Sequence, residues 1–380
     1  MQHKLSSVIP QILDAGLMDM TTITIMLSIF SFAGIIFAIP AGALVGKIGP
    51  KKTILLASLI TSLSSLAVFA DNMMVFIVFR ALEGISLILA VVAGPVLIQQ
   101  VVEPARRGIA VGIIICAGGL GAFIAGFIVP RLFNAGELVA VWLGLGVFAL
   151  MTGTIFFFTV KDKASCVEGS TGKMGDTAAV VEKPSYTSIF TKNTLLLFAS
   201  LIVFHLMLIA TVSFSPTFLQ QHGVNPNMSG VISTIPMLLG ILSSVLFGAL
   251  ADKTHKYKIL YLIGFIGMSA GVFLMFTNTG AELWIGAAAV GLLGLGTPAI
   301  AMAVFPQMLR SPTLISMGIG VLTVVQCFGQ FLGTSLPPFL LGEGLNNWVL
   351  MQFVLLGLGA AGLIAALACS FKKEGTLDQN

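Results

Sequence analysis

The sequence reads Gly42-Ala43-Leu44-Val45-Gly46-Lys47-Ile48-Gly49-Pro50-Lys51-Lys52, and a related stretch returns later as Gly248-Ala249-Leu250-Ala251-Asp252-Lys253. Each stretch closes an apolar segment of helix length and opens a short basic turn before the next apolar segment. The offset, 248 minus 42, is 206 residues, which is more than half of the 380 residues in the chain. Gly34 and Gly240 keep the same offset of 206. The chain therefore repeats itself once, which predicts two related halves around a central site.

The composition is that of a chain surrounded by lipid. Hydrophobic residues make up 57% of it and charged residues 9%, whereas soluble domains carry roughly 25% charged residues. Mostly apolar runs recur along the whole length, and each has the ~18 or more residues that a helix needs to cross a bilayer. The runs lack the alternation of a membrane β-strand. The sequence therefore predicts an all-α membrane protein in contact with the lipid bilayer.

Eleven such runs are present, and they predict membrane-spanning helices at residues 21–45, 53–70, 73–101, 108–133, 138–160, 194–219, 228–250, 258–277, 282–308, 314–341 and 347–371. Two equal halves cannot be built from an odd number of helices. Residues 1–17 are too short and too polar to span, yet Ser6-Ser7-Val8-Ile9-Pro10 is typical of the exit end of a helix. We therefore expect a partial first helix whose start lies upstream of Met1.

The positive charges lie mostly in every second turn, which places them on one side of the predicted spans. Of the 19 Lys and Arg residues, 16 fall on one side: Lys47, Lys51, Lys52, Arg106, Arg107, Lys161, Lys163, Lys173, Lys183, Lys192, Lys253, Lys256, Lys258, Arg310, Lys372 and Lys373. The opposite turns carry Asp71, Glu137, Glu282 and Glu343, with Arg131 as their clear cation. The positive-inside rule places the basic side, and with it the C-terminus, in the cytoplasm.

This pattern divides the chain into two helical bundles. Residues 1–160 are expected to form the N-terminal bundle and residues 193–371 the C-terminal bundle. Residues 161–192 are polar and rich in Gly, Ser, Thr, Lys and Glu, which is typical of a flexible cytoplasmic linker. Residues 372–380 form a cytoplasmic tail. We expect no soluble catalytic domain, and the four cysteines, Cys116, Cys166, Cys327 and Cys369, lack metal-ligand spacing.

The repeated stretches resemble the motif between helices two and three of the major facilitator superfamily, which reads roughly Gly-x-Leu-Ala-Asp-Arg-x-Gly-Arg-Lys. Arg80-Ala81-Leu82-Glu83-Gly84 resembles the helix-four motif of the same family. The resemblance covers nearly the whole chain. It implies two six-helix bundles, a solute site between them and alternating access by rocking. Residues 2–10 also resemble the second half of helix one in bacterial cyanate and nitrate-type transporters, which implies a bacterial inner membrane.

The sequence departs from the family motif in both copies. Gly46 stands where the first copy normally has Asp, and His255 stands where the second normally has Gly. In the family that Asp helps to latch the cytoplasmic ends of helices from opposite halves, so only Asp252 remains for this role. The residues expected in these gating loops are Gly42, Gly49, Lys51, Gly248, Asp252 and Lys253. Residues 108–133 lack the Gly-Pro pair that exporters of the family often have.

Arg80 and Glu83 are the charges that lie inside an apolar span. Arg80 is about seven residues into its span, so roughly 10 Å deep. An intramembrane Arg costs at least ~2.5–3.5 kcal/mol and normally faces a wet cavity or a partner. It can contact an anionic solute, or it can form a structural ion pair with Glu83 on the same helix face. Glu83 can carry a coupling proton, or it can be a static partner of Arg80.

Four further residues are candidates for the solute site. Lys4 would be a second buried cation if helix one extends upstream, and a solvated terminal residue if it does not. His205 lies midway along the seventh helix of the full count, where it can titrate or simply pack between helices. Gln326 and Gln330 share one face of a helix and can bind solute or join helices by hydrogen bonds.

These observations favour a secondary transporter and not an enzyme, with no catalytic residue, cofactor or metal. The cations predict a small organic or inorganic anion as solute, with protons as the coupling ion of a symporter. A proton-driven exporter of drugs or metabolites is the alternative of the same class. A non-transporting membrane protein, either truncated or acting as a sensor, is the alternative of another class. No nucleic-acid partner is expected, and we expect a monomer.

Overall fold

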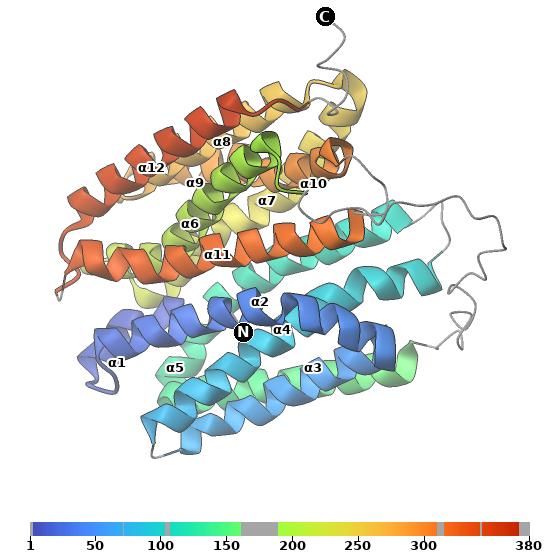
Figure 1. The fold of residues 1–380 in the computed structure, drawn as a ribbon. Helices are drawn as coiled ribbons and strands as arrows, with labels where there is room; N and C mark the ends of the chain where they lie inside the picture. Colours follow the sequence, from blue (N-terminus) through green and yellow to red (C-terminus); the bar gives the residue numbers. More distant parts are fainter. Residues whose placement is uncertain are drawn as a thin grey trace, which may run out of the picture.

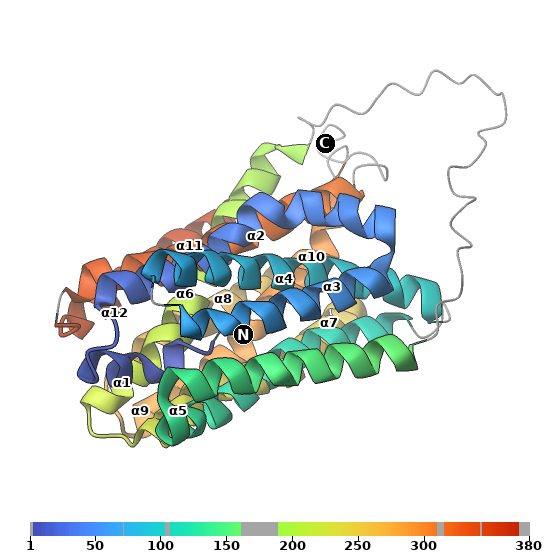
Figure 2. The same ribbon diagram turned by 90° about the horizontal axis from the view of Figure 1, so that it is seen from below.

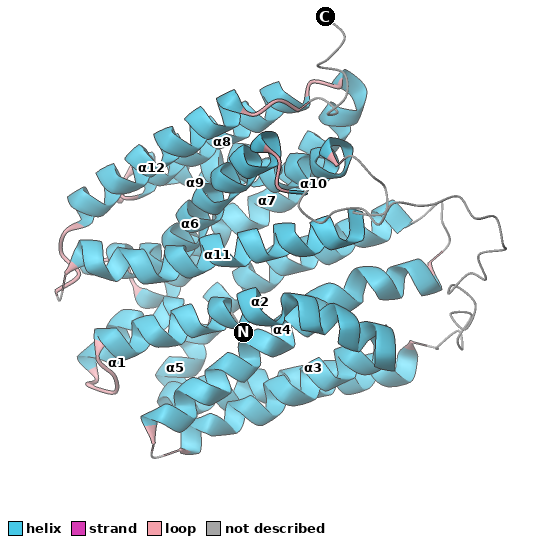
Figure 3. Cartoon of the chain, viewed as in Figure 1, coloured by secondary structure: helices cyan, strands magenta, loops and turns pink. Residues whose placement is uncertain are grey.

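The computed structural model describes residues 3–70, 72–102, 107–160, 189–309, 315–342 and 344–371. All regular structure in these residues is helical, as predicted (Figure 3). Ten of the described helices are long and apolar enough to cross a membrane. Several expectations fall outside the description, namely those for most of the linker, for the tail, for Asp71, Arg106, Arg310 and Glu343, and for the side chain of Asp252.

The first half of the chain begins with two short helical segments and continues with long apolar helices. Its elements are η1 (Ser6–Val8), α1 (Ile9–Asp14), α2 (Met20–Ile48), α3 (Pro50–Ser64), η2 (Ser65–Phe69), α4 (Met73–Val101) and α5 (Arg107–Thr159). Polar side chains start two of the long helices. The Asp19 carboxylate accepts from the Thr22 backbone N–H, and the Asn72 side chain accepts from the Met74 N–H at 2.8 Å. These caps satisfy backbone donors that the helix leaves free.

The helix α5 contains two membrane crossings and a reversal of the chain. Its backbone leaves helical geometry at Gly136 and Glu137, where Glu137 has a φ of 52°. A Cβ at Gly144 would lie 3.3 Å from a methyl carbon of Leu132, although 12 residues of straight helix span about 18 Å. The two limbs of α5 are therefore antiparallel. Counting them separately turns the ten apolar helices into eleven crossings, which agrees with the predicted eleven spans.

The second half of the chain is also a set of packed helices. Its elements are α6 (Lys192–Gln221), α7 (Pro226–Thr254), α8 (Tyr257–Met275), α9 (Ala281–Ala288), η5 (Ala289–Leu293), η6 (Gly294–Gly296), α10 (Thr297–Met308), α11 (Ile315–Leu341) and α12 (Trp348–Ala368). The crossing from α9 to α10 passes through a π-helical turn and a 3-10 turn. Glycine permits close packing there, because a Cβ at Gly296 would lie 2.3 Å from the ring of Phe247 in α7.

The helices of the two halves form separate groups that meet along two seams. In Figure 1 most of the helices of the first half, blue through teal to green, lie below those of the second half, yellow-green to red. The first seam is formed by α2 with α11, and the second by α5 with α7. Figure 2 gives a view from below, in which α3, α4 and α5 lie nearest the reader. The short segment η1 lies between the two groups, in contact with α5 of the first half and with α6 and α7 of the second.

Both seams depend on small residues. A Cβ at Gly126 of α5 would lie 2.3 Å from the backbone oxygen of Gly230 in α7, and the reverse distance is 2.4 Å. A Cβ at Gly34 of α2 would lie 2.7 Å from the sulfur of Cys327 in α11. The hydroxyl of Ser28 is hydrogen-bonded to that of Ser335 at 2.8 Å. Close backbone approach is the usual way to join helices in a membrane, where both lipid and side chains are apolar.

The seam of α2 with α11 is closed toward one end of the molecule. We call this the α1 end, because α1, the turn from α6 to α7 and the turn from α11 to α12 lie there (Figure 1). The bond between Ser28 and Ser335 lies near it. Gly320 lies seven residues before Cys327 on the same face of α11, and a Cβ there would meet nothing within 4 Å. The two helices are therefore farther apart away from the α1 end.

The expected gating loops are shorter than predicted. Gly42 lies inside α2, Lys51 inside α3, and Gly248, Asp252 and Lys253 inside α7. Gly49 alone separates α2 from α3, and the second turn consists of His255 and Lys256. The stretches from Gly42 to Ile48 and from Gly248 to Thr254 contain no proline, so no residue in them lacks the backbone N–H that continues a helix. The predicted loop residues are thus helix ends.

Candidate functional site

Three charged side chains are buried together where the N-terminal segment meets α4. Lys4 comes just before η1, and it is 0% exposed. Arg80 and Glu83 lie three residues apart on one face of α4, where they are 2% and 1% exposed. The sequence did not decide whether Lys4 is buried or solvated, and in the structure it is buried. Arg80 and Glu83 also lie inside the fold, as their position in the apolar span predicted.

Glu83 holds both cations at once. One carboxylate oxygen, Oε1, pairs with the Lys4 ammonium, and the other, Oε2, pairs with the Arg80 guanidinium. The Nε of Arg80 also donates to the backbone oxygen of Met26 in α2, at 3.2 Å. The group of Lys4, Arg80 and Glu83, which we call the charge cluster, therefore joins three parts of the chain. Two cations and one carboxylate give it a formal charge of +1.

Aromatic rings cover the cations of the charge cluster. The Lys4 ammonium lies 3.9 Å from the ring centroid of Trp142 in the second limb of α5. The Arg80 guanidinium carbon lies 4.5 Å from the ring centroid of Phe30 in α2. Such contacts stabilise a cation by about 0.5–2 kcal/mol when water is excluded. Sequence reasoning missed Trp142 and Phe30, because an aromatic residue within an apolar span looks the same whether it faces lipid or a charge.

The arrangement favours binding of an anion over any covalent chemistry. A planar guanidinium matches a carboxylate with two parallel hydrogen bonds, and the ammonium adds a compact point charge. An entering carboxylate would compete with Glu83 for these partners. Among the described residues, no group of His, Cys, Asp and Glu side chains could hold a metal ion.

The other predicted site residues lie in the second half. The Nδ1 of His205 is 2.9 Å from the backbone oxygen of Leu201, so its ring bonds within its own helix α6. Its Cβ lies against Gly329 of α11, which makes His205 part of the packing between these helices. Gln326 and Gln330 are half-buried, four residues apart on one face of α11. They lie on α11 of the second half, whereas Arg80 and Glu83 lie on α4 of the first half.

The two basic turns are related by the repeat offset. Lys51 lies 4.7 Å from the ring centroid of Phe157, across the contact of α3 with α5. Lys253 is exposed. A Cβ at Gly42 or at Gly248 would meet nothing within 4 Å, so neither glycine is required by close packing. The latch that the family resemblance implies for Asp252 stays a prediction.

Comparison with known proteins gives the family. The family model described as Major Facilitator Superfamily matches residues 4–334. The gallate transporter of Pseudomonas putida is 25% identical over 363 residues, which cover 87% of this chain and 79% of that protein. The 4-hydroxybenzoate transporter of Acinetobacter baylyi is 23% identical over 352 residues, which cover 83% of this chain and 75% of that protein. The likeness of residues 2–10 to cyanate and nitrate-type transporters stays a prediction.

Solved structures give the same fold. The D-xylose-proton symporter matches with a TM-score of 0.71 at 14% identity, over 98% of this chain and 94% of that one. A bacterial homolog of the human lysosomal transporter Spinster, in an inward-facing and occupied conformation, matches with a TM-score of 0.71 at 15% identity, over 97% and 93%. With the matched family model and the apolar helices, this chain is an integral membrane protein and a secondary transporter, and it belongs to the Major Facilitator Superfamily.

Proposed function

We propose that this transporter moves a small organic anion across the membrane and binds its carboxylate at the charge cluster. The observation that supports this proposal is the excess positive charge of Lys4, Arg80 and Glu83, which are at most 2% exposed. Buried charges are costly, and a cluster made of two cations and one carboxylate is suited to an anionic partner. The cluster touches α2, one helix of the first seam, through the bond of Arg80 to the Met26 backbone oxygen. We propose that alternating access exposes the cluster to each side of the membrane in turn.

A hydroxylated aromatic acid is the solute class that we favour. The rings of Trp142 and Phe30 border the two cations, so a flat aromatic solute could stack beside the group that holds its carboxylate. The related transporters of gallate and 4-hydroxybenzoate carry names of such acids. A relative from Bacillus subtilis, 24% identical over 261 residues, is named a hexuronate transporter, whose solute is also a carboxylate.

Coupling to protons follows from the role of Glu83. The carboxylate is neutralised by Lys4 and Arg80 while no solute is bound. When a solute carboxylate takes these partners, Glu83 is left as a buried charge without compensation, and a proton is the simplest way to neutralise it. The solute and the proton would then enter together, which is symport. Uptake is the direction that we propose.

Alternating access would use the two seams. We propose that residues 1–160 and 193–371 move as two bundles, joined by the linker at residues 161–192. The α1 end would face away from the cytoplasm of a bacterial inner membrane, and the C-terminus would lie inside. The tighter seam at that end then corresponds to a state closed to the outside.

Counterflow into proteoliposomes tests the proposal. Proteoliposomes that contain the full-length protein are loaded with unlabelled 4-hydroxybenzoate, and entry of the labelled acid is measured. Arg80→Gln should abolish exchange, because the guanidinium fork is lost. Arg131→Gln is the matched control, since Arg131 is exposed and, within the described part of the chain, its contacts are with Phe127 one helical turn away. Full exchange by Arg80→Gln would refute the anion site. Symport is tested separately by net uptake into empty proteoliposomes, and uptake that an imposed proton gradient does not drive would refute it.

A further inference from the structure

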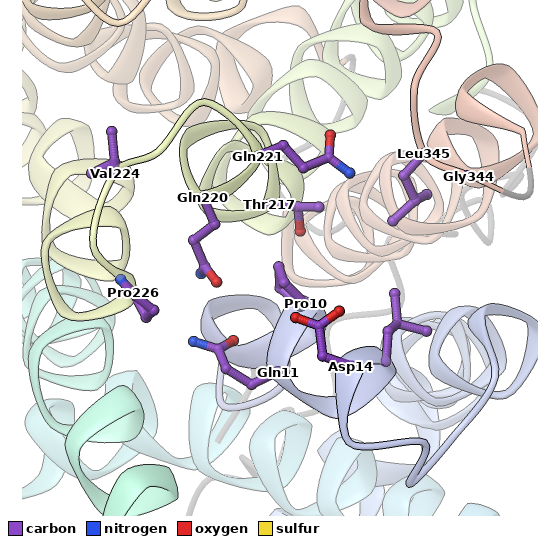
Figure 4. Close-up of a pocket in the computed structure, with 11 residues that line it drawn as sticks. Pro10, Gln11, Asp14, Thr217, Gln220, Gln221, Val224, Pro226, Gly344 and Leu345 are labelled. Atoms are coloured by element: carbon purple, nitrogen blue, oxygen red, sulfur yellow. The ribbon is translucent and has the colours of Figure 1, made fainter.

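A polar pocket opens at the α1 end, apart from the charge cluster. It encloses about 460 Å³. Its walls come from both halves of the chain: Pro10, Gln11, Leu13, Asp14, Thr217, Gln220, Gln221, Val224, Pro226, Gly344 and Leu345. We call it the α1-end pocket (Figure 4). Pockets of about 300–1,000 Å³ accept small organic molecules, so this one is large enough for a single ring.

Two wall residues present polar atoms that the protein does not satisfy. Thr217 is 1% exposed, and its hydroxyl has no hydrogen-bond partner among the described residues. The side-chain amide of Gln11 is likewise buried without a partner there, at both its nitrogen and its oxygen. A buried polar group without a partner costs about 1–3 kcal/mol. A ligand that bonds to Thr217 and Gln11 would remove this cost.

The other polar wall residues are held in place. Gln220 donates to the Ser229 hydroxyl at 3.0 Å, and the Gln221 oxygen accepts from the Trp348 indole at 2.7 Å. In Figure 4 the Asp14 carboxylate is turned into the pocket below Thr217, and the Gln220 side chain is directed toward Gln11. Carboxylate, amide and hydroxyl groups thus converge on one space from α1 and α6.

The chemistry of these walls selects the ligand. Among the described wall residues none is a cation, and the one charged group, Asp14, is negative. The pocket would therefore repel a carboxylate and accept hydroxyl groups, which can donate to Asp14 and exchange hydrogen bonds with Gln11 and Thr217. We propose that the α1-end pocket is a second solute site, which binds a small polyhydroxylated ring through its hydroxyl groups.

The pocket is separate from the charge cluster. Leu5, Val8 and Ile9, each 0% exposed, lie along the segment between Lys4 and the pocket wall at Pro10. Because both halves build the pocket, a bound ligand holds them together at the α1 end. Occupancy should therefore oppose opening at this end, and a saturating polyol should slow transport. The inference goes beyond the proposed function, since it requires neither an anionic solute nor protons.

Isothermal titration calorimetry of the full-length protein in lipid nanodiscs tests this site, with myo-inositol as the neutral probe. The decisive variant is Thr217→Val, which removes the hydroxyl and keeps the side-chain shape. Thr211→Val is the matched control, because Thr211 is also buried in α6 but donates to the Met207 backbone oxygen at 2.8 Å. We expect Thr217→Val to weaken inositol binding about tenfold, the effect of one good hydrogen bond, and Thr211→Val to leave it unchanged.

Titrations of gallate and of benzoate into the Arg80→Gln variant show whether the ligand of the pocket is a hydroxy acid or a neutral polyol. If gallate still binds this variant and benzoate does not, the pocket takes the hydroxyl end of a hydroxy acid. If only inositol binds, the ligand is a neutral polyol. Equal inositol affinity in the parent and in Thr217→Val, or no inositol binding to the parent, would overturn the inference. Because Arg80→Gln keeps the α1-end pocket, failure here is distinct from failure of the anion site.

Discussion

Lys4 and Glu83 form an ion pair across 79 residues of sequence, and the pair joins the N-terminal segment to α4. Arg80 occupies the other oxygen of the same carboxylate. The three charges therefore act as a unit, in which the removal of any member changes the surroundings of the other two. Residues in one such network show free energies of substitution that do not add.

Glu83→Gln should be strongly destabilising on its own. It leaves the Lys4 and Arg80 cations buried together without a carboxylate, and breaking a buried ion pair costs about 3–5 kcal/mol. The double variant Lys4→Met with Glu83→Gln keeps the formal charge at +1 by removing one charge of each sign. We expect its melting temperature in detergent to lie above that of Glu83→Gln alone. A double variant less stable than Glu83→Gln would contradict this account.

Trp142 should contribute to stability through the Lys4 ammonium, which lies 3.9 Å from its ring centroid. Trp142→Phe keeps an aromatic face, whereas Trp142→Leu removes it. We expect the leucine variant to be less stable than the phenylalanine variant by about 0.5–2 kcal/mol, the range of a cation–π contact. In a Lys4→Met background the difference between the two variants should shrink. A difference that persists there would assign the effect of Trp142 to packing, for example against Phe76.

Gly49 and His255 are equivalent by the repeat, since 255 minus 49 is 206. Both end a helix with a positive φ, of 84° at Gly49 and 52° at His255. Gly49 also has a ψ of 155°, a combination that only glycine adopts readily, so Gly49→Ala should destabilise by about 1–3 kcal/mol. His255→Gly should raise the melting temperature, because a side chain in the left-handed region costs roughly 1–2 kcal/mol. A lower melting temperature for His255→Gly would show that its ring makes a compensating contact.

The fold was largely predictable from the sequence. Hydrophobic runs long enough to span a bilayer identify the helices, and the reversal at Gly136 and Glu137 matches the gap between two predicted spans. The resemblance to the family motif also predicted that His255 stands at a position where that motif has Gly. These features can be read from short stretches of sequence or from its periodicity. A bilayer leaves few alternatives to a helix, because any backbone exposed to lipid must satisfy its own hydrogen bonds.

The site was predictable only in part. Charges inside apolar spans are rare enough to identify Arg80 and Glu83 directly. The burial of Lys4 could not be decided, because it depends on how a short N-terminal segment packs against α4. Trp142 was missed because apolar spans face both lipid and protein. The α1-end pocket combines residues from α1, from the α6–α7 region and from the turn before α12, and polar residues at helix ends are ordinary in each sequence segment taken alone.

Gly126 should control how closely the two halves meet. A Cβ there would lie 2.3 Å from the Gly230 backbone oxygen, whereas at Gly121, in the same limb of α5, it would meet nothing within 4 Å. Gly126→Ala should therefore force α5 and α7 apart, and Gly121→Ala should not. Ala15 and Asn346 are both exposed at the α1 end. After the native cysteines are replaced, spin labels on cysteines introduced at these two positions would report the distance between the halves by pulsed electron paramagnetic resonance.

We expect Gly126→Ala to lengthen the distance between these labels, and Gly121→Ala to reproduce the parent distribution. If Gly126→Ala leaves the distribution unchanged, the seam of α5 with α7 adapts locally, and the halves do not separate through it. If Gly121→Ala shifts the distribution as well, the effect belongs to glycine within α5 and not to the contact. Only the difference between the two variants ties the separation of the halves to the Gly126–Gly230 approach, because both make the same chemical change in one helix limb.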